Sequence, residues 1–178
     1  MSGTLLYRFM LWLVGLGAWI RPAPGDNPLR LIEEDLSRRY AAIRHDTPAV
    51  VAEFMEGRVT AALIVDTRSA AEYAVSHLAG AAHVDPGIAG EAFVEQLGSR
   101  LKGRHVVFYC AVGLRSSKVA MRLLPLLQAY DAKTVSNLSG GLFRWHNEGR
   151  PVVGAADDAC ATVHPFNAYW ARFLKSRH

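Results

Sequence analysis

The sequence predicts an α/β fold in which a mostly parallel central sheet is flanked by helices. Short apolar runs typical of buried strands alternate with segments whose apolar residues recur at helical spacing, and this alternation favours parallel strands joined by helices. The chain has 178 residues, of which 51% are hydrophobic, so it is long enough for one domain with a core and is not predicted to be disordered. Its net charge of +4 comes from scattered basic residues, which do not indicate a nucleic-acid partner.

The most apolar segment covers residues 4–20, and Arg8 interrupts it near its start. The uninterrupted part, 9–20, is too short to cross a bilayer as a straight helix, whereas the whole segment reaches the lower limit of a spanning length. Three interpretations remain open: a membrane-associated anchor, a helix packed on the domain, or a cleaved signal peptide. If residues 4–20 form an anchor, the basic residues that follow them place the domain in the cytoplasm.

A helical leader is expected over residues 28–59, after a proline-rich linker that ends the apolar N-terminal segment, 1–27. Apolar residues in the stretch 29–43 recur at the spacing of one helical face, which predicts an amphipathic helix. A second, short helix is expected over 49–56, because Thr47 followed by proline is a typical helix start.

Strands and helices alternate from residue 60 to residue 153, which is the expected extent of the main domain. The expected strands cover 61–65, 80–84, 106–109 and 133–138, and the expected helices cover 69–73, 91–101, 116–129 and 140–145. Pro125 lies inside the long helix and is expected to kink it or to shorten its last turn. Ligands of parallel sheets bind beyond the carboxyl ends of the strands, so Cys110, directly after the central strand, lies where a site is expected.

The C-terminal tail, residues 154–178, carries large apolar side chains on one face of an expected helix. These residues are Phe166, Tyr169, Trp170, Phe173 and Leu174. A helix of this kind is expected to dock over an apolar groove of the domain, and the alternative is contact with a partner or a membrane surface.

A strand, a tight loop and a helix start meet at Cys110, and this arrangement predicts a reactive thiolate. Backbone N–H groups of such a loop point inward and the helix dipole adds positive potential, so negative charge is stabilised there. Gly113 allows a backbone conformation that a Cβ would hinder, and Arg115 adds a fixed charge with a planar set of donors. Ser116 and Ser117 are expected to cap the helix that follows. Without these neighbours, a cysteine at a strand end is more typical of a buried structural thiol.

A second cysteine, Cys160, lies in the tail. Two cysteines do not make a disulfide framework, and no group of cysteines and histidines has the spacing of metal ligands. One alternative is that Cys160 resolves a reaction intermediate on Cys110 by forming a disulfide with it. An incidental tail cysteine is favoured instead, because nothing in the sequence brings the two residues together. A reduced Cys110 fits a reducing compartment.

Four short motifs resemble those of the rhodanese family of sulfurtransferases, and they follow one another in the family's order. They are the D-T-R…E-Y motif at 66–73, the S-H-L-A-G-A motif at 76–81, the cysteine loop at 109–116 and the L-S-G-G…W…G-R-P motif at 138–151. Ser76 and Ala79 stand where glycine and proline are common in the family. The resemblance covers residues 60–153 and implies a three-layer rhodanese-like domain, with the helical leader and the tail as extensions.

The resemblance implies a sulfurtransferase that works through a persulfide. Cys110 would take a sulfane sulfur from a small-molecule donor such as thiosulfate and pass it to a thiophilic acceptor, which is a thiol, cyanide or an acceptor protein. Asp66 and Arg68 would brace neighbouring loops, with simple surface charges as the alternative, and His77 would fix a loop, with proton transfer as the alternative. Neither a metal nor a cofactor is implied, and the oligomeric state is left open. The expected substrate-binding residues are Ala111, Val112, Gly113, Leu114, Arg115 and Ser116.

The length of the cysteine loop separates this function from the main alternative enzyme. Four residues lie between Cys110 and Arg115, whereas cysteine phosphatases, including relatives of the same fold, have one more and so make room for phosphate. Ala111 and Val112 are uncharged, so the loop suits thiosulfate less well than loops with basic residues at these positions. Outside the enzymes, the alternatives are a persulfide carrier without turnover and a binding or regulatory module, and the presence of Cys110 with Arg115 argues against the module.

Overall fold

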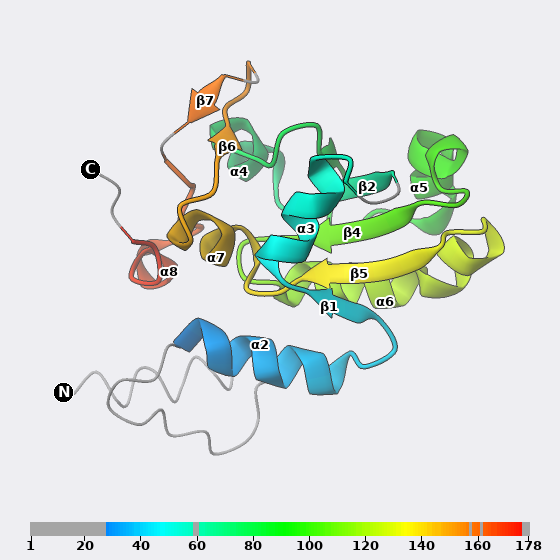
Figure 1. Ribbon diagram of the computed structural model, residues 1–178, viewed down its shortest axis with the longest axis horizontal. Helices are drawn as coiled ribbons and strands as arrows, with labels where there is room; N and C mark the ends of the chain where they lie inside the picture. Colours follow the sequence, from blue (N-terminus) through cyan, green and yellow to red (C-terminus); the bar gives the residue numbers. More distant parts are fainter. Residues whose placement is uncertain (1–27, 59–60, 157, 161, 176–178) are drawn as a thin grey trace.

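The computed structural model describes residues 28–58, 61–156, 158–160 and 162–175, which form a five-stranded parallel sheet with helices on both faces (Figure 1). The strand order is β1-β5-β4-β2-β3, and every neighbouring pair is parallel. This confirms the predicted α/β fold with a mostly parallel, helix-flanked sheet. The strands are β1 (Arg44–Asp46), β2 (Ala62–Asp66), β3 (Ala82–His83), β4 (His105–Tyr109) and β5 (Thr134–Leu138).

Helices cover the two faces of the sheet, with α3 on the near side and α6 on the far side in Figure 1. Side chains of each inner strand alternate between two core clusters, because successive residues of a strand point to opposite faces. Leu63 and Val65 of β2 face the cluster that α5 and α6 complete, whereas Ile64 faces the cluster that contains α3 and α7. The helices are α2 (Pro28–Arg39), α3 (Pro48–Met55), α4 (Ala70–Val75), α5 (Gly90–Leu97), α6 (Leu114–Ala129), α7 (Gly141–Asn147) and α8 (Ala168–Ala171).

The segment 28–59, expected as a helical leader, also supplies the edge strand β1 of the sheet. Helix α2 ends at Arg39, so the expected helical face does not continue to Ile43, which is buried in the cluster shared with α6. The sequence of β1 is Arg-His-Asp, and the strand pairs in parallel with β5. Such a short polar stretch has no apolar run that signals a strand, so its conformation depends on pairing with β5.

Helix α6 starts earlier than expected and is not shortened by its proline. It begins at Leu114 and continues through Pro125 to Ala129. Two other elements are shorter than the sequence predicts. Strand β3 has two residues, and α5 gives way to a 3₁₀ turn at Gly98–Arg100. These differences lie at element ends, where local sequence patterns are least decisive.

The expected capping of α6 by serine side chains is wrong. The N-cap residue is Gly113, and no side chain caps the helix. The Ser116 hydroxyl instead donates to Asn137 Oδ1 of β5 at 2.6 Å, and the Ser117 hydroxyl donates to the Gly113 carbonyl at 2.8 Å. Both serines are buried and their hydroxyls are satisfied inside the domain, and the Ser116 bond fixes the helix start against the sheet.

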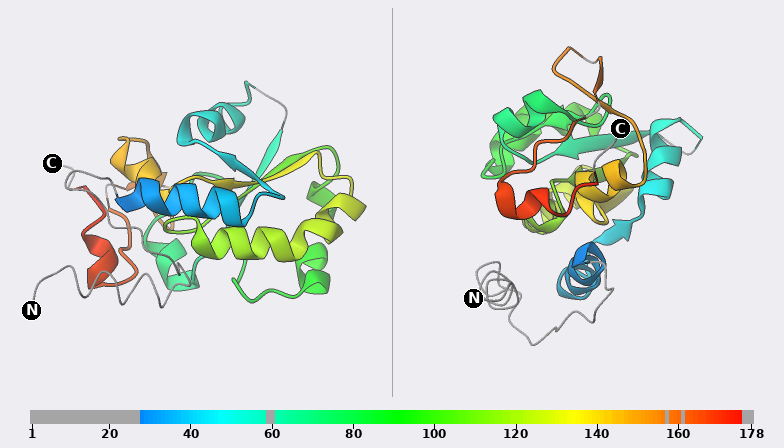
Figure 2. Two further views of the ribbon diagram at one scale, coloured as in Figure 1. Left: turned by 90° about the horizontal axis from the view of Figure 1, so that it is seen from below. Right: turned by 90° about the vertical axis from the view of Figure 1, so that its left-hand side faces the viewer.

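The tail forms a small hairpin and a short helix in place of the longer helix expected. Trp170, Phe173 and Leu174 pack against the core cluster that contains α7. Asn147 Nδ2 at the end of α7 donates to the Phe173 carbonyl at 2.7 Å. The tail therefore docks on the domain beside α7, which Figure 2 shows from two further sides. The hairpin pairs β6 (Val152–Val153), which directly precedes the tail, with β7 (Ala159–Cys160), and the two strands are antiparallel.

The anchor interpretation of the segment 4–20 stays a prediction, because this segment lies outside the described residues. Among the helices formed by the described residues, none is long and apolar enough to cross a bilayer. Buried residues of α2 pack this helix on the domain, as its amphipathic pattern predicts; they are Leu29, Ile32 and Leu36.

Candidate functional site

The loop after β4 holds the candidate nucleophile Cys110 at the carboxyl edge of the sheet. Strand β4 is buried along its whole length and ends at Tyr109, and α6 begins at Leu114. Gly113 has a φ of 95°, in the region that favours glycine, and its N–H donates to Cys110 Sγ at 3.2 Å. A Cβ on Gly113 would also lie 2.9 Å from Asn137 Nδ2. The turn thus brings one N–H group and the N-terminal end of α6 towards the sulfur, which favours negative charge there.

Helix α7 fixes the same loop from the side of β5. The N–H groups of Leu142 and Phe143 donate to the carbonyl oxygens of Cys110 and Ala111, both at 2.9 Å. Gly141 makes this approach possible, because its φ is 56° and a Cβ would lie 2.6 Å from the Ala111 oxygen and closer still to the Cys110 oxygen. The second glycine of the fourth sequence motif is therefore required by backbone contact with the cysteine loop.

Gly141→Ala is expected to destabilise the protein and to displace the cysteine loop. The left-handed backbone costs an L-residue about 1–2 kcal/mol, and crowding against the two carbonyl oxygens adds roughly 1–3 kcal/mol. Gly149→Ala is the matched control, because Gly149 has a φ of 82° and no atom within 4 Å of its Cβ position. Urea unfolding should show the backbone cost in both variants and the added cost only in Gly141→Ala. Equal losses of stability would contradict the close contact.

Arg115, the cation of the cysteine motif, forms a two-pronged ion pair with Glu72 of α4. Its Nη1 and Nη2 donate to the two carboxylate oxygens at 2.8 and 2.7 Å. Glu72 also accepts from the N–H and the hydroxyl of Ser69, the N-cap residue of α4, and so closes a capping box. The carboxylate therefore holds the guanidinium in one orientation beside the loop.

The pair shifts the protonation equilibria of both partners. Burial alone would raise the pKa of Glu72, but the hydrogen bonds and the charge of Arg115 outweigh burial and lower this pKa from 4.5 to about 2. Burial opposes the charge of Arg115 as well, yet its hydrogen bonds to Glu72 and its electrostatic interactions with Cys110 and Glu72 raise the pKa of Arg115 above its usual range. Arg115 and Cys110 also line the same small pocket, which is described below.

Protonation of Glu72 is expected to weaken the fold at acid pH. Its pKa in the folded protein lies below the ordinary value, so the stabilisation is complete above pH 4.5 and is lost as the pH falls towards 2. This shift corresponds to about 3 kcal/mol. Glu72→Gln keeps an acceptor for the capping box but removes the charge. Its unfolding free energy is measured in urea from neutral pH to about pH 3. It should be lower than that of the wild type at neutral pH and should fall less as the pH is lowered.

The control for this measurement is Glu34→Gln, which removes an exposed ion pair with Arg30 on α2. Exposed pairs contribute little, so the stability and its pH dependence should stay close to those of the wild type. If Glu72→Gln and the wild type lose stability in parallel as the pH falls, Glu72 is not the group responsible.

A small, mainly apolar pocket lies beside Cys110. Its volume is about 180 Å³. Cys110 is 1% exposed, so a reactant that approaches the sulfur has to enter this pocket. The ring of Phe166 lies over Arg115, with 4.9 Å between the guanidinium carbon and the ring centre. The lining residues come from the loop, the start of α6 and the tail: Cys110, Ala111, Val112, Leu114, Arg115, Phe166 and Trp170.

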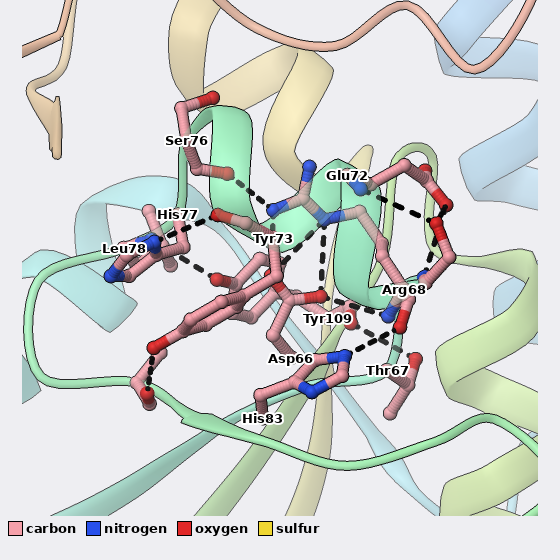
Figure 3. A network of polar contacts seen from close by, with 12 residues as sticks. Asp66, Thr67, Arg68, Glu72, Tyr73, Ser76, His77, Leu78, His83 and Tyr109 are labelled. Atoms are coloured by element: carbon pink, nitrogen blue, oxygen red, sulfur yellow. Dashed lines mark hydrogen bonds and ion pairs between the residues drawn. The ribbon is translucent and has the colours of Figure 1, made fainter. Parts of the chain in front are cut away.

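A second polar cluster lies behind the loop, around the buried residue Tyr109 (Figure 3). Asp66 and Arg68 form an ion pair with no exposed surface, in which Arg68 Nη2 lies 2.6 Å from Asp66 Oδ2. The same nitrogen donates to the Ser76 carbonyl at 2.5 Å. The Tyr109 hydroxyl accepts from the Leu78 N–H at 3.0 Å, and burial followed by the charge of Asp66 raises the pKa of Tyr109, which keeps the hydroxyl protonated. These contacts tie the ends of β2 and β4 to the connection that follows α4.

His77 belongs to this cluster and does not line the pocket (Figure 3). Its ring stacks on Tyr73, with 3.8 Å between the ring centres, and its Nδ1 lies 3.0 Å from the Tyr73 carbonyl oxygen. Its backbone exchanges two hydrogen bonds with Val153 of β6, at 2.8 and 2.9 Å. His77 therefore joins α4 to the tail hairpin.

The structure separates the predicted site residues into a pocket group and a supporting group. Most of the loop residues line the pocket, whereas Gly113 shapes the turn and Ser116 is buried against β5. The supporting group behind Tyr109 contains Asp66, Arg68 and His77.

Three residues of the site are not singled out by the sequence. Glu72 lies in the first motif, and its spacing after Ser69 indicates only a capping box. Phe166 and Trp170 show the apolar spacing of a docking helix, which says nothing about the pocket that they cover. Their roles depend on contacts between segments far apart in the chain.

Cys160 lies on β7, and both cysteines are free thiols. The Cys160 sulfur lies 3.6 Å from the Val75 carbonyl oxygen and 3.4 Å from that of Thr162. These contacts give no support to a disulfide with Cys110. Within the part of the chain that the structure describes, no group of three or more histidine, cysteine and acidic side chains could hold a metal ion.

The model of one protein family, the rhodanese-like domain, matches residues 28–148 of this chain. The match runs from the start of α2 to just beyond the end of α7, and so includes the whole segment 28–59. No curated protein sequence matches the chain.

Solved structures with a similar fold share little sequence with this chain. A Bacillus halodurans protein is 18% identical, with 78% of this chain and 97% of that chain covered and a TM-score of 0.58. A thiosulfate sulfurtransferase from Pseudomonas aeruginosa is 19% identical, with 82% of this chain and 26% of that chain covered and a TM-score of 0.57. A Saccharomyces cerevisiae homologue of single-domain rhodanese and of a phosphatase catalytic domain is 22% identical. The match covers 60% of this chain and 82% of that chain, with a TM-score of 0.51. At these identities the likeness establishes the fold alone.

Proposed function

The chain belongs to the rhodanese-like domain family, and on this basis we propose that it is a sulfurtransferase that carries sulfur on Cys110. The sulfur comes from a small-molecule donor and is held as a persulfide, Cys110–S–S⁻, until a thiol, cyanide or an acceptor protein removes it. The observation that carries the proposal is the surroundings of Cys110. The residue lines a small pocket, its sulfur accepts from the Gly113 N–H, and the charge of Arg115 lies nearby.

The transfer proceeds in two displacement steps at sulfur. In the first step the Cys110 thiolate attacks the sulfane sulfur of the donor. With thiosulfate, a new S–S bond to Cys110 forms, the S–S bond of the donor breaks, and sulfite leaves with the electron pair. In the second step the acceptor attacks the outer sulfur of the persulfide, and Cys110 leaves as a thiolate. The Gly113 N–H and the N-terminal end of α6 stabilise anionic sulfur on Cys110 in both steps.

Arg115 and the cluster around Tyr109 support this chemistry in different ways. Glu72 holds Arg115 in place, so the positive charge beside the sulfur needs no rearrangement during the reaction. The Thr67 N–H and hydroxyl both bond to the carbonyl of Tyr109, the residue before the nucleophile, at 2.9 and 3.1 Å. These bonds fix the start of the loop, which is the positioning role proposed for the residues at the end of β2.

The short loop supports sulfur transfer over phosphate hydrolysis. Four residues separate Cys110 from Arg115, one fewer than in the phosphatase loop. Arg115 already donates to both carboxylate oxygens of Glu72, so a phosphate would have to compete for these donors. A single sulfur atom bound to Cys110 does not have to compete with Glu72 for the donors of Arg115.

The test is the mass of the full-length protein after incubation with thiosulfate and, separately, with an organic persulfide. We expect a mass increase of one sulfur atom on the peptide that contains Cys110, and its removal by cyanide as thiocyanate. Cys160→Ser should load in the same way, because Cys160 does not line the pocket. If well-folded protein shows no sulfur adduct on Cys110 with either donor, the proposed function fails.

A further inference from the structure

Two aromatic residues of the tail, Phe166 and Trp170, complete the pocket beside Cys110. Trp170 packs against the core cluster that contains α7, so its position is set by the domain. Phe166 is 50% exposed and has a φ of 66°, which is uncommon for a residue with a side chain. A hydrogen bond of 2.8 Å from the Asn167 N–H to the Pro165 carbonyl closes the turn around it. The tail therefore presents Phe166 to the pocket through a defined local conformation.

This pocket offers a ligand less positive charge than the cysteine loop motif, with its arginine, suggests. Among the described residues that line it, only Arg115 is cationic. Two of its nitrogens donate to Glu72, and the ring of Phe166 lies over the guanidinium. A small dianion would lose its water on entry and would meet this one cation, already paired with Glu72, whereas an apolar group would meet apolar side chains.

We infer that the pocket selects sulfur donors that carry an apolar group and a single negative charge, such as organic thiosulfonates and persulfides, over inorganic thiosulfate. The inference rests on the proposed function for its reaction and specifies which donors enter the site. Phe166 and Trp170 contact the apolar group and act as specificity-determining residues. An apolar cavity of ~150 Å³ accommodates benzene, so a pocket of about 180 Å³ has room for one ring beside the sulfur.

The reaction of such a donor balances without an added oxidant or reductant. The Cys110 thiolate attacks the sulfane sulfur of a thiosulfonate, R–SO₂–S⁻. The S–S bond to Cys110 forms as the S–S bond of the donor breaks, and the sulfinate R–SO₂⁻ leaves with the electron pair. The products are the persulfide anion and the sulfinate, so two negative charges are present before and after the step.

The first part of the test compares donors on the full-length protein. Benzenethiosulfonate, methanethiosulfonate and thiosulfate are each mixed with the protein, and sulfur loading of Cys110 is followed by intact mass. Each rate constant is divided by that of free cysteine with the same donor, which removes differences in chemical reactivity. The corrected rate constant should be at least ~10-fold higher for benzenethiosulfonate than for thiosulfate, which is the discrimination that apolar pocket contacts supply.

Two variants assign this preference to the pocket. Phe166→Ala should lower the preference for benzenethiosulfonate over thiosulfate by roughly 3- to 10-fold. Its folding should be little affected, because the side chain is half exposed. Tyr130→Ala removes another exposed aromatic ring, just beyond the end of α6 and outside this pocket, and should leave the preference unchanged.

The second part measures binding without sulfur transfer. Benzenesulfonate, an unreactive analogue, should bind the wild type more tightly than sulfate in ligand-observed NMR, and Phe166→Ala should weaken that binding. Corrected rates that do not differ between donors, or benzenesulfonate binding that is unchanged in Phe166→Ala, would overturn the inference and leave the proposed function standing. If no donor loads Cys110 but benzenesulfonate still binds in a Phe166-dependent manner, the proposed function fails and the pocket selectivity is supported.

Discussion

Cys110→Ser abolishes sulfur transfer if the proposed function is correct. Serine keeps an acceptor for the Gly113 N–H, so the loop should stay folded. Its hydroxyl, however, is not ionised at neutral pH and cannot hold a transferable sulfur. Removing the nucleophile of an enzyme can cost a factor of about 10⁶ in turnover, so thiocyanate formation from a sulfur donor and cyanide should fall to the uncatalysed rate.

Cys160→Ser is the control for this experiment, because it removes the other thiol and should keep full turnover. Turnover in a well-folded Cys110→Ser variant would contradict the persulfide mechanism. A different result, in which the wild type loads sulfur on Cys110 but does not pass it to cyanide or a small thiol, would identify a carrier that delivers sulfur to a protein partner. The wild type therefore distinguishes an enzyme from a carrier, and the two variants test the nucleophile.

The parts of the fold that follow from local sequence could be predicted. Continuous apolar runs identify β2 and β4, because strands buried on both faces have no polar side to interrupt them. The position of Cys110 after β4 then places the candidate site, since parallel strands end at one common edge. Gly113 and Gly141 also stand out in the sequence, and the structure gives each a positive φ and a close neighbour that explain the absence of a side chain.

The parts that depend on distant contacts could not be predicted. The sequence predicts Arg115 as a substrate-binding residue but does not reveal its partner Glu72, which lies 43 residues earlier in the chain. Strand β1 forms because β5 offers a paired edge, and its own sequence carries no strand pattern. In the tail, apolar spacing predicts docking, but the course of the chain that brings Phe166 over Arg115 is set by packing.

Arg68→Met is expected to lower the unfolding free energy by about 3–5 kcal/mol, because it leaves the Asp66 carboxylate buried without its partner. Neither side chain of the pair has exposed surface. Within the described structure, Arg68 Nη1 has no hydrogen-bond partner, so the pair does not satisfy all of its polar atoms. A pair of this kind is costly to break but gives little net stability over uncharged side chains of similar size.

The double variant Asp66→Asn/Arg68→Met tests this distinction. Asparagine keeps the acceptor for the backbone N–H of residue 68, which Asp66 Oδ1 binds at 2.9 Å, while both buried charges are removed. Its stability loss in urea should therefore be smaller than the sum of the two single losses, by about 1–3 kcal/mol. Arg30→Met, which breaks an exposed pair, should change stability by less than about 1 kcal/mol. Additive losses would show that the two side chains act independently.

Since neither residue lines the pocket, folded protein of each variant should still load sulfur on Cys110, which separates a supporting role from a catalytic one.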